Sequence, residues 1–430
     1  MGSRQNTMTN ELNRVEVETA VNRFTRWLDG YGETSYDHQS YFAGGMGRSA
    51  KALYYRKPLL GMLAVSPMIL SEAFFPSARR LFWKPQRFPI ADAHYAMGFA
   101  FLARMEQRES HLKRAIHFLE VLEATRSKGF RNYCWGYPFN WETRTGTYHE
   151  GTPMITSVPY MYEAFRQVHE LDGNPHWLEV MRSIAQHALE DYQDVEMSPT
   201  ASSCSYSPGK ENTKGVINAS AYRAFVLTRA AIDFSDEKYR KVAERNLNFV
   251  IESQNPNGSW YYSTDNVRDF VDHFHTCFVL KALTKIEHLT GSPQCRSAIE
   301  RGVEYYVKNL FDSDGLPKPF SKAPRLTVYR RELYDYAECI NVGVLLSGRF
   351  PELDGNVSRV ISDVLRRWQK SDGSFRAREL LIGWDNVPMH RWAQAQMFRS
   401  LCFYLANAQL NAAPSVSDGA LISQMSRAEN

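Results

Sequence analysis

The chain has 430 residues, of which 43% are hydrophobic and 23% are charged, a composition typical of a globular protein with a large core. Its 51 Lys and Arg against 47 Asp and Glu give a formal charge of +4, which is too balanced for a nucleic-acid-binding surface. The six Cys residues are scattered without a CxxC pair, which excludes a zinc-finger framework and is typical of a reducing compartment.

The first elements in chain order are a predicted helix over residues 20–32 and an apolar run over residues 58–75. Residues 1–14 contain no apolar segment of the signal-peptide type, which favours a cytoplasmic location. The apolar run is short for a membrane span and contains Pro67 and Glu72. Two interpretations stay open: a buried helix kinked at Pro67, or a surface helix with basic flanks that binds a membrane surface or a partner. The second predicts a peripheral membrane contact through residues 51–87, at the inner membrane surface.

Helical periodicity continues from there to the end of the chain, and the helices come in pairs. Within each pair the first helix is the more apolar and the second carries more charge, as an inner and an outer ring would require. The predicted helices cover residues 90–105, 110–129, 154–173, 174–193, 217–234, 236–254, 272–291, 293–311, 332–350, 351–369 and 389–410. If the N-terminal helix pairs with the last one, six hairpins result, which predicts an all-α (α/α)6 toroid. We expect one domain over residues 1–410 and a mobile polar tail over 411–430.

Two loops have nearly the same pattern, which supports a repeated hairpin. "QNPNGSW" begins at Gln254 and "QKSDGSF" begins at Gln369. Both read Gln, two turn residues, then any residue, Gly, Ser and an aromatic residue. The pattern is similar to the Gln–Gly–aromatic turns of terpene-cyclase and prenyltransferase toroids, but the chain has no aspartate cluster for isoprenoid chemistry.

The long links join each second helix to the next first helix, so we expect them to meet at one mouth of the toroid. They cover residues 132–152, 202–218, 257–275, 316–338 and 372–391. They are rich in Tyr, Trp, His and Arg, which are typical of a carbohydrate site. We expect no cofactor and no metal ion at this mouth.

Two carbohydrate chemistries fit this mouth. Hydrolysis needs a protonated and an ionised carboxyl group about 5–10 Å apart. The candidate carboxylates are Asp272, Asp335, Glu338 and Asp385. Proton abstraction beside a uronate carboxylate instead needs a base, cationic donors and, for an epimerase, an acid on the opposite face of the sugar. The abundance of Tyr, His and Arg favours proton abstraction, and a non-catalytic glycan-binding or assembly protein stays open as another class.

The stretch from residue 135 to residue 289 resembles the catalytic domain of D-glucuronyl C5-epimerases, the enzymes of heparosan and heparan sulfate. The resemblance depends on "WGYPF" from Trp135, "GVINAS" around Asn218, "GSWY" over residues 258–261, and Arg268, Asp269 and "HFHT" from His273. A family tyrosine just before the His-Thr pair is Phe274 here. The resemblance implies a toroid that modifies a uronate-containing polysaccharide or lipid-linked glycan, by epimerisation or by the lyase reaction that shares its first step. Capsule or exopolysaccharide synthesis would be the setting.

The same resemblance implies roles for individual residues. It makes Tyr261 the leading acid or base, Tyr206 or Tyr262 the group on the opposite face, and His275 the residue that polarises or orients the uronate, with His273 beside it. The residues expected to bind substrate are Trp135, Tyr137, Arg144, Asn218, Trp260, Arg330, Trp384 and His390. Among these, the tryptophans would stack on sugar rings and the arginines would hold the carboxylate.

Overall fold

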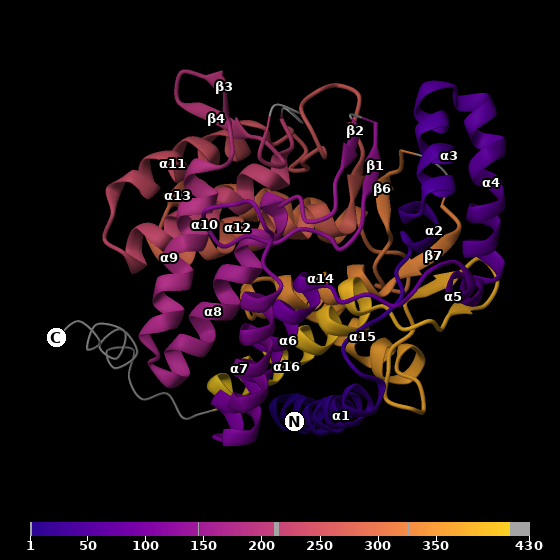
Figure 1. The fold of residues 1–430 in the computed structure, drawn as a ribbon. Helices are drawn as coiled ribbons and strands as arrows, with labels where there is room; N and C mark the ends of the chain where they lie inside the picture. Colours follow the sequence, from indigo (N-terminus) through magenta and orange to yellow (C-terminus); the bar gives the residue numbers. More distant parts are fainter. Residues whose placement is uncertain (1, 145, 210–214, 325–326, 413–430) are drawn as a thin grey trace.

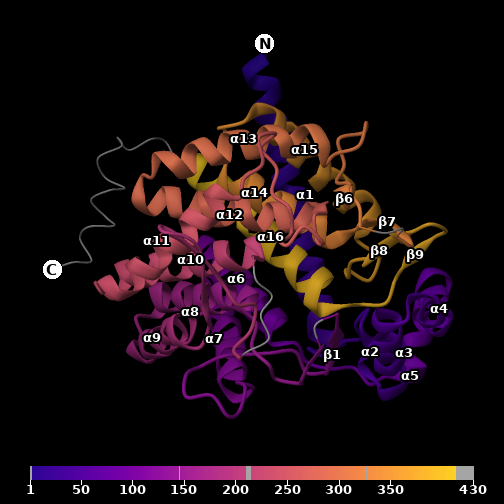
Figure 2. The ribbon, with the colours of Figure 1, turned by 90° about the horizontal axis from the view of Figure 1, so that it is seen from above.

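The computed structural model of the chain describes residues 2–144, 146–209, 215–324 and 327–412. Most of the predicted tail, residues 413–430, lies outside the described residues. Within them, helices dominate, and they alternate between an inner and an outer ring (Figures 1 and 2). The inner helices are α6 (Pro89–Glu106), α8 (Val158–Asp172), α10 (Ile217–Asp233), α12 (His273–Thr290), α14 (Leu333–Leu345) and α16 (Ala395–Ala412). The outer helices are α7 (Glu109–Ala124), α9 (Pro175–Glu190), α11 (Glu237–Glu252), α13 (Pro293–Asn309), α15 (Pro351–Asp363) and α1 (Gly2–Tyr31).

Each inner helix packs against the next inner helix along the chain, and α16 packs against α6. The inner ring is therefore closed. Each outer helix packs against the inner helix of its own pair, and α1 takes the sixth outer position, against α16. The predicted (α/α)6 toroid, with the N-terminal helix pairing with the last one, is confirmed.

Burial explains why the two helices of a pair differ in sequence. The inner helix α10 is buried on all sides through its first three turns. The outer helix α11 buries one stripe at three- and four-residue spacing, which consists of Tyr239, Ala243, Asn246, Phe249 and Val250. Its other faces are charged and exposed, as expected for a helix with solvent on one side.

The short links within pairs have strong local signals. Gly173 ends α8 in the left-handed conformation, with φ of 65°, and the Asn174 side chain accepts the N–H of His176 at 3.1 Å to begin α9. Pro175 occupies the first helical position, where its missing N–H costs nothing. Gly291, Ser292 and Pro293 repeat this arrangement between α12 and α13.

The two Gln loops also have the same structure. The Gln254 amide donates to the Gly258 carbonyl at 3.0 Å and to the Ala298 carbonyl of α13 at 2.9 Å. The Gln369 amide donates to the Gly373 carbonyl at 3.0 Å and to the Ala20 carbonyl of α1 at 2.8 Å. Each glutamine thus joins its own loop to the next outer helix. The loop at Gln369 connects the end of the outer ring to its beginning.

The glycine of each Gln loop is a position that a side chain would disturb. Gly258 has φ of 89°, and a Cβ there would lie 2.3 Å from the Arg301 carbonyl oxygen. We expect Gly258→Ala to lower the free energy of unfolding by about 2–5 kcal/mol, from left-handed strain and from overlap. Gly291→Ala is the matched control, because φ is 69° but nothing lies within 4 Å, so about 1–2 kcal/mol is expected. Urea unfolding of both variants measures the difference; equal losses would contradict the role of the contact.

The links between pairs carry short strands, and Figure 1 shows β1–β4 and β6 at one end of the ring. The pairs are antiparallel: β1 with β2, β3 with β4, β5 with β6, and β7 with β8, which also pairs with β9. The bounds of the strands, in order from β1 to β9, are Trp141–Thr143, Gly146–Tyr148, Asp194–Ser198, Ala201–Cys204, Val271–Asp272, Phe320–Lys322, Tyr329–Glu332, Arg378–Leu380 and Trp384–Asp385. Two π-helical turns, Val364–Trp368 and His390–Gln394, follow α15 and precede α16. A 3-10 turn, Ile155–Ser157, precedes α8.

One insert, between α1 and α6, lies outside the two rings (Figure 2). It contains α2 (Ser40–Ala43), α3 (Gly45–Arg56), α4 (Pro58–Phe74), a 3-10 turn (Pro76–Ala78) and α5 (Arg79–Phe82). The predicted apolar run forms α4, with Pro67 inside it, and most of its large apolar side chains are exposed. The interpretation as a surface helix therefore holds, and the interpretation as a buried helix is wrong. No single helix of the described chain is long and apolar enough to cross a membrane; α4 passes that test only together with Pro76–Phe82, from which it is bent by 113°.

Candidate functional site

Asp272 and His275 form a pair at the start of α12. Asp272 has an extended backbone, and its Oδ1 accepts the N–H of His275 at 2.9 Å, so it caps the helix. Its other oxygen, Oδ2, lies 2.6 Å from Nδ1 of the His275 ring. Because a carboxylate accepts hydrogen bonds and does not donate them, Nδ1 is the donor in this contact. The pair therefore holds an imidazole with its basic nitrogen directed away from the aspartate.

A small open pocket with about 10 Å³ of enclosed space lies beside this pair. It is lined by Asn218, Trp260, Tyr261, Tyr262, Phe270, Asp272, His275, Thr276 and Val279. The Asn218 side chain is buried, and neither its amide nitrogen nor its amide oxygen has a hydrogen-bond partner among the described residues. Buried amides are normally paired, so this one is a candidate for contact with a ligand. The enclosed space is that of about one water molecule, so a sugar ring would enter only if the lining side chains moved apart.

Two tyrosines at the mouth retain their protons at neutral pH. The Tyr262 ring packs edge-on against the His275 ring, with centroids 4.7 Å apart, and burial raises its pKa to about 12. Burial also raises the pKa of Tyr206 well above its usual value, and the nearby Tyr262 and Tyr137 hydroxyls add to the rise. These phenols can donate a proton but are poor bases. Among the mouth residues, His275 is therefore better suited to act as the base.

Below the mouth, the centre of the toroid holds one polar side chain from each inner helix. We call these six residues the central polar layer: His94, Tyr160, Tyr222, Lys281, Glu338 and Arg399. Lys281 forms an ion pair with Glu338 and donates to the Tyr160 hydroxyl at 3.0 Å, and that hydroxyl lies 2.6 Å from the Tyr222 hydroxyl. Burial lowers the pKa of Lys281 to about 8.

Two members of the central polar layer lack polar partners. Both ring nitrogens of His94 are buried without a hydrogen bond, and burial holds its pKa well below the usual value. Arg399 is 6% exposed and lies over the Tyr160 ring at 5.1 Å, and it makes no hydrogen bond or ion pair with any described residue. A buried guanidinium without an anion is costly, so the site favours an anionic group in this place.

Asp335 connects the mouth to the central polar layer. It is fully buried in the first turn of α14, and Oδ1 has no hydrogen-bond partner among the described residues. Burial, together with Glu332 and Asp272, holds the pKa of this carboxyl well above its usual value, which favours the protonated form of Asp335. Of the predicted carboxylates, the structure thus brings Asp272, Asp335 and Glu338 together.

Two of the predicted stacking residues, Trp135 and Trp260, face the protein interior. Trp135 is 3% exposed, and its indole N–H donates to the Leu122 carbonyl of α7 at 2.7 Å. Trp260 is also 3% exposed, and it donates to the Val250 carbonyl of α11 at 2.9 Å. In both loops the ring folds back onto the preceding outer helix. This position argues against sugar stacking by their faces, because both rings belong to the repeated packing of the toroid.

Two of the predicted histidines are also interior residues. His273 is fully buried, with Nδ1 3.2 Å from the Leu310 carbonyl and Nε2 2.7 Å from the Tyr306 hydroxyl. His390 is held between the Tyr95 hydroxyl and the Gly32 carbonyl. Burial lowers the pKa of each to about 3. Both ring nitrogens of each histidine are thus engaged, which corrects the prediction that these two residues act on substrate.

The remaining predicted residues lie around the mouth or on the surface. Tyr261 lines the pocket but is 38% exposed, with the Lys322 ammonium 4.9 Å from its ring centre. Tyr137 is half-buried, with the Arg391 guanidinium 4.6 Å from its ring centre. Arg144 and Arg330 are exposed, in the turn between β1 and β2 and on β7. Trp384 packs against Trp368, between the guanidinium groups of Arg367 and Arg376, and it does not line the pocket.

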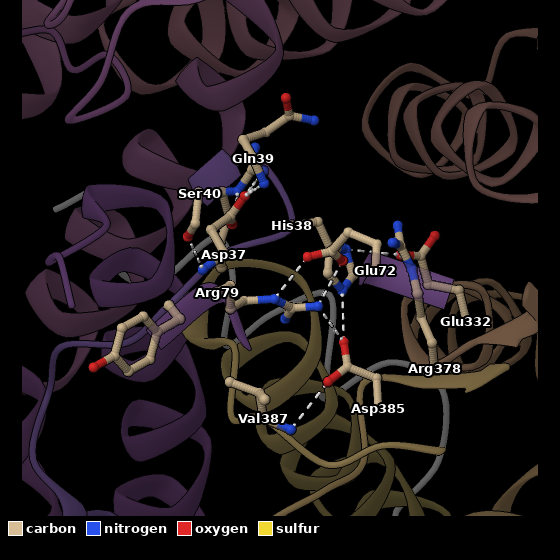
Figure 3. Close-up of polar contacts among 12 residues, drawn as sticks. Asp37, His38, Gln39, Ser40, Glu72, Arg79, Glu332, Arg378, Asp385 and Val387 are labelled. Atoms are coloured by element: carbon tan, nitrogen blue, oxygen red, sulfur yellow. Dashed lines mark hydrogen bonds and ion pairs between the residues drawn. The ribbon is translucent and has the colours of Figure 1, made fainter. Parts of the chain in front are cut away.

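The fourth predicted carboxylate, Asp385, belongs to a buried ion cluster that joins the insert to β7–β9 (Figure 3). Arg79 of α5 donates to Glu72 of α4 at 2.9 and 2.6 Å and to Asp385 at 2.7 Å. His38 Nε2 lies 3.3 Å from Asp385. Burial alone would raise the pKa of Asp385, but Arg79 and His38 hold it well below its usual range. Its charge is already neutralised, so Asp385 is better explained as an anchor for the insert than as a catalytic group.

Oxygen and nitrogen atoms of His38, Glu72 and Asp385 are close enough together to hold a metal ion. The Arg79 guanidinium, however, bonds to both carboxylates of this set. A cation in that place would compete with a fully buried positive charge. The donor set therefore does not fit a metal site.

Comparisons with known proteins agree with this architecture. No family model matches the chain, and no curated protein matches it in sequence. A cellobiose 2-epimerase from Bacillus thermoamylovorans is similar in structure, with a TM-score of 0.58 at 11% identity over 74% of this chain and 87% of that one. The cellobiose 2-epimerase from Spirochaeta thermophila gives 0.57 at 13% identity over 81% and 99%. A GH76 α-mannanase from Bacteroides thetaiotaomicron gives 0.56 at 9% identity over 76% and 88%.

At these identities the likeness shows the fold alone, the (α/α)6 toroid. The more specific resemblance to glucuronyl C5-epimerases is not tested by these structures and stays a prediction.

Proposed function

We propose that this chain is a carbohydrate-modifying enzyme that abstracts the C5 proton of a uronate residue in a glycan, as a C5-epimerase does. The observation that carries the proposal is the Asp272–His275 pair, which directs a basic imidazole nitrogen away from its aspartate, beside a small open pocket. Support for the substrate class comes from the fold, because toroids of similar structure are described as sugar epimerases, mannanases and a polysaccharide lyase. The finer assignment to a uronate depends on the sequence resemblance and on the charges below the pocket.

In this proposal His275 Nε2 takes the C5 proton, while Asp272 fixes the ring tautomer and stabilises the imidazolium that forms. The electron pair left at C5 moves onto the uronate carboxylate, which becomes an enolate. Reprotonation at C5 from the opposite face inverts the centre and gives the epimer. Tyr206 and Tyr262 are the candidate donors for that step, because both retain a phenolic proton at neutral pH.

Negative charge that develops on the carboxylate needs fixed positive partners. Arg399 is our candidate for this role, because no described residue forms a hydrogen bond or ion pair with its buried guanidinium. Lys281 lies beside it but already forms an ion pair with Glu338. The predicted Arg144 and Arg330 would contact the glycan farther out, on the exposed rim of the mouth.

The experiment that tests the proposal is proton NMR of uronate polysaccharides, heparosan first, incubated with the protein in deuterium oxide. Deuterium at C5 with unchanged chain length is the expected result. An unsaturated uronate product would indicate a lyase, which shares the proton abstraction. No exchange with any uronate polymer would overturn the proposal and favour a glycan-binding protein.

A second candidate function is glycoside hydrolysis, which Asp335 favours. A carboxyl that is held protonated near the ionisable Asp272 is the combination that a glycosidase needs. New reducing ends without exchange at C5 would select this function.

The protonation of Asp335 can itself be tested through stability. Its folded pKa lies above its unfolded value, so the stability it contributes is present below about pH 4 and is lost as the pH rises toward the folded pKa. Asp335→Asn keeps the shape of the protonated acid and removes this loss. We expect the Tm of the variant to gain on the wild type as the pH rises from 4 to 8. A Tm difference independent of pH would contradict the assignment.

A further inference from the structure

The insert exposes a large apolar surface that nothing in the described chain covers. Helix α4 is apolar on almost every face, but only the stripe containing Gly61, Val65, Glu72 and Ala73 is buried. The other faces of α4 and the segment after it expose large side chains: Leu59, Leu60, Met62, Leu63, Ile69, Leu70, Phe74, Phe75, Leu81 and Phe82. Leu59 is 79% exposed and Leu81 is 83% exposed. We call these ten residues the hairpin surface. Contiguous apolar surfaces of this kind mark interaction sites.

The hairpin surface is bordered by positive charge. Residues 45–87 contain eight Lys and Arg and a single acidic residue, Glu72, a formal charge of +7, whereas the whole chain carries +4. Arg56, Lys57, Arg80 and Lys84 are exposed and form no ion pair with a described residue. The one acidic residue is buried against Arg79. An occupant of this surface therefore meets apolar side chains surrounded by uncompensated cations.

The insert is a folded and anchored element, so the exposure of its apolar side chains does not come from loose packing. A Cβ at Gly61 of α4 would lie 2.0 Å from the Tyr54 Cα of α3, which shows that the two helices touch at the backbone. The ion cluster of Glu72, Arg79 and Asp385 fastens α4 and α5 to the toroid (Figure 3). Figure 1 shows α3 and α4 standing at the same end of the ring as β1–β4. The hairpin surface thus has a fixed place at the mouth end of the toroid.

We infer that the hairpin surface binds the interface of an anionic lipid membrane. Large apolar side chains beside Lys and Arg are the combination that inserts into the acyl boundary while the cations reach the anionic headgroups. A second copy of this chain fits less well, because a symmetric contact would place one ring of cations against the same ring of its partner. Helix α4 by itself is not long and apolar enough to cross a membrane, and the chain bends by 113° after it.

Flotation of the full chain with vesicles tests this inference without depending on catalysis. Binding to vesicles of phosphatidylcholine with phosphatidylglycerol is expected, and binding to phosphatidylcholine alone should be much weaker. The variant Leu59→Ser/Leu63→Ser/Leu70→Ser should reduce the partition coefficient about a hundredfold. The variant Arg56→Gln/Lys57→Gln/Arg80→Gln should reduce it about fivefold for each charge removed.

Matched controls change the same kinds of side chain on other faces. Met197→Ser/Ile232→Ser removes exposed apolar residues, and Arg108→Gln/Arg240→Gln removes exposed cations; both should bind vesicles like the wild type. Because the leucines are exposed, the Ser variants should keep the Tm of the wild type.

Equal binding to both lipid mixtures, or binding unaffected by the leucine changes, would overturn the inference. A dimer by light scattering that the Leu→Ser changes dissociate, without vesicle binding, would overturn it in favour of self-association. Vesicle binding without C5 exchange would leave this inference standing and remove the proposed function.

Discussion

Replacing His275 by Gln is expected to lower kcat for C5 exchange by about 10²–10⁴, the usual contribution of a positioned general acid or base. The backbone N–H of residue 275 still bonds to Asp272, so the helix cap survives the change. The side chain is 20% exposed and Gln is of similar size, so the Tm should stay close to that of the wild type. The loss should appear in kcat more than in KM, because the lost interaction belongs to the transition state.

Two further variants sharpen this prediction. His288→Gln changes an exposed histidine near the end of the same helix, α12, and should leave kcat unchanged. Asp272→Asn still offers an oxygen to the helix N-terminus but loses the negative charge beside Nδ1, so it too should lower kcat. A His275→Gln enzyme with kcat within about twofold of the wild type would remove His275 from the reaction.

Replacing Lys281 by Met is expected to cost about 3–5 kcal/mol of unfolding free energy, because it leaves the Glu338 carboxylate buried without its partner. The Lys281 ammonium also donates to Tyr160, so the bonded pair of tyrosine hydroxyls loses a neighbour. Urea unfolding measures the loss directly.

The double variant Lys281→Met/Glu338→Gln distinguishes an ion-pair effect from a packing effect. With no charge left unpaired, most of the lost stability should return, and the two changes should be strongly non-additive. Additive losses would contradict the pairing of these residues in the central polar layer.

The sequence predicted the architecture well because each local signal agreed with the ring. Apolar and charged helices alternate, turns such as that at Gly173 and Asn174 separate them, and the two Gln loops repeat. The sequence also identified Asp272 as a candidate carboxylate, and the structure shows that it caps α12 while orienting His275.

The site was harder to predict, because the direction in which a side chain points depends on packing between segments that are far apart in the sequence. His273 and His275 are two residues apart at a helix start, and only the position of Tyr306 on α13 shows which of them faces outward. The Trp135 and Trp260 rings sit in loops but turn back onto outer helices, which loop composition does not reveal.

The central polar layer was missed except for Glu338, although it left a signal. Lys281 and Arg399 are isolated charges within apolar stretches of inner helices, and His94 lies in a similar stretch of α6. Each of these residues is a polar exception in an otherwise apolar stretch of its helix. Only closure of the ring brings these side chains together, so the sequence of a single helix does not show that they form a cluster.

The most direct test of the central claim is a crystal structure of the His275→Gln variant with a bound glucuronate oligosaccharide. We expect a uronate ring in the pocket lined by Asn218 and Tyr262, with C5 about 3–3.5 Å from the side chain of residue 275. Its carboxylate should face Arg399. A sugar bound elsewhere on the toroid, or one whose C5 faces away from residue 275, would contradict the assignment of the Asp272–His275 pair as the reactive centre.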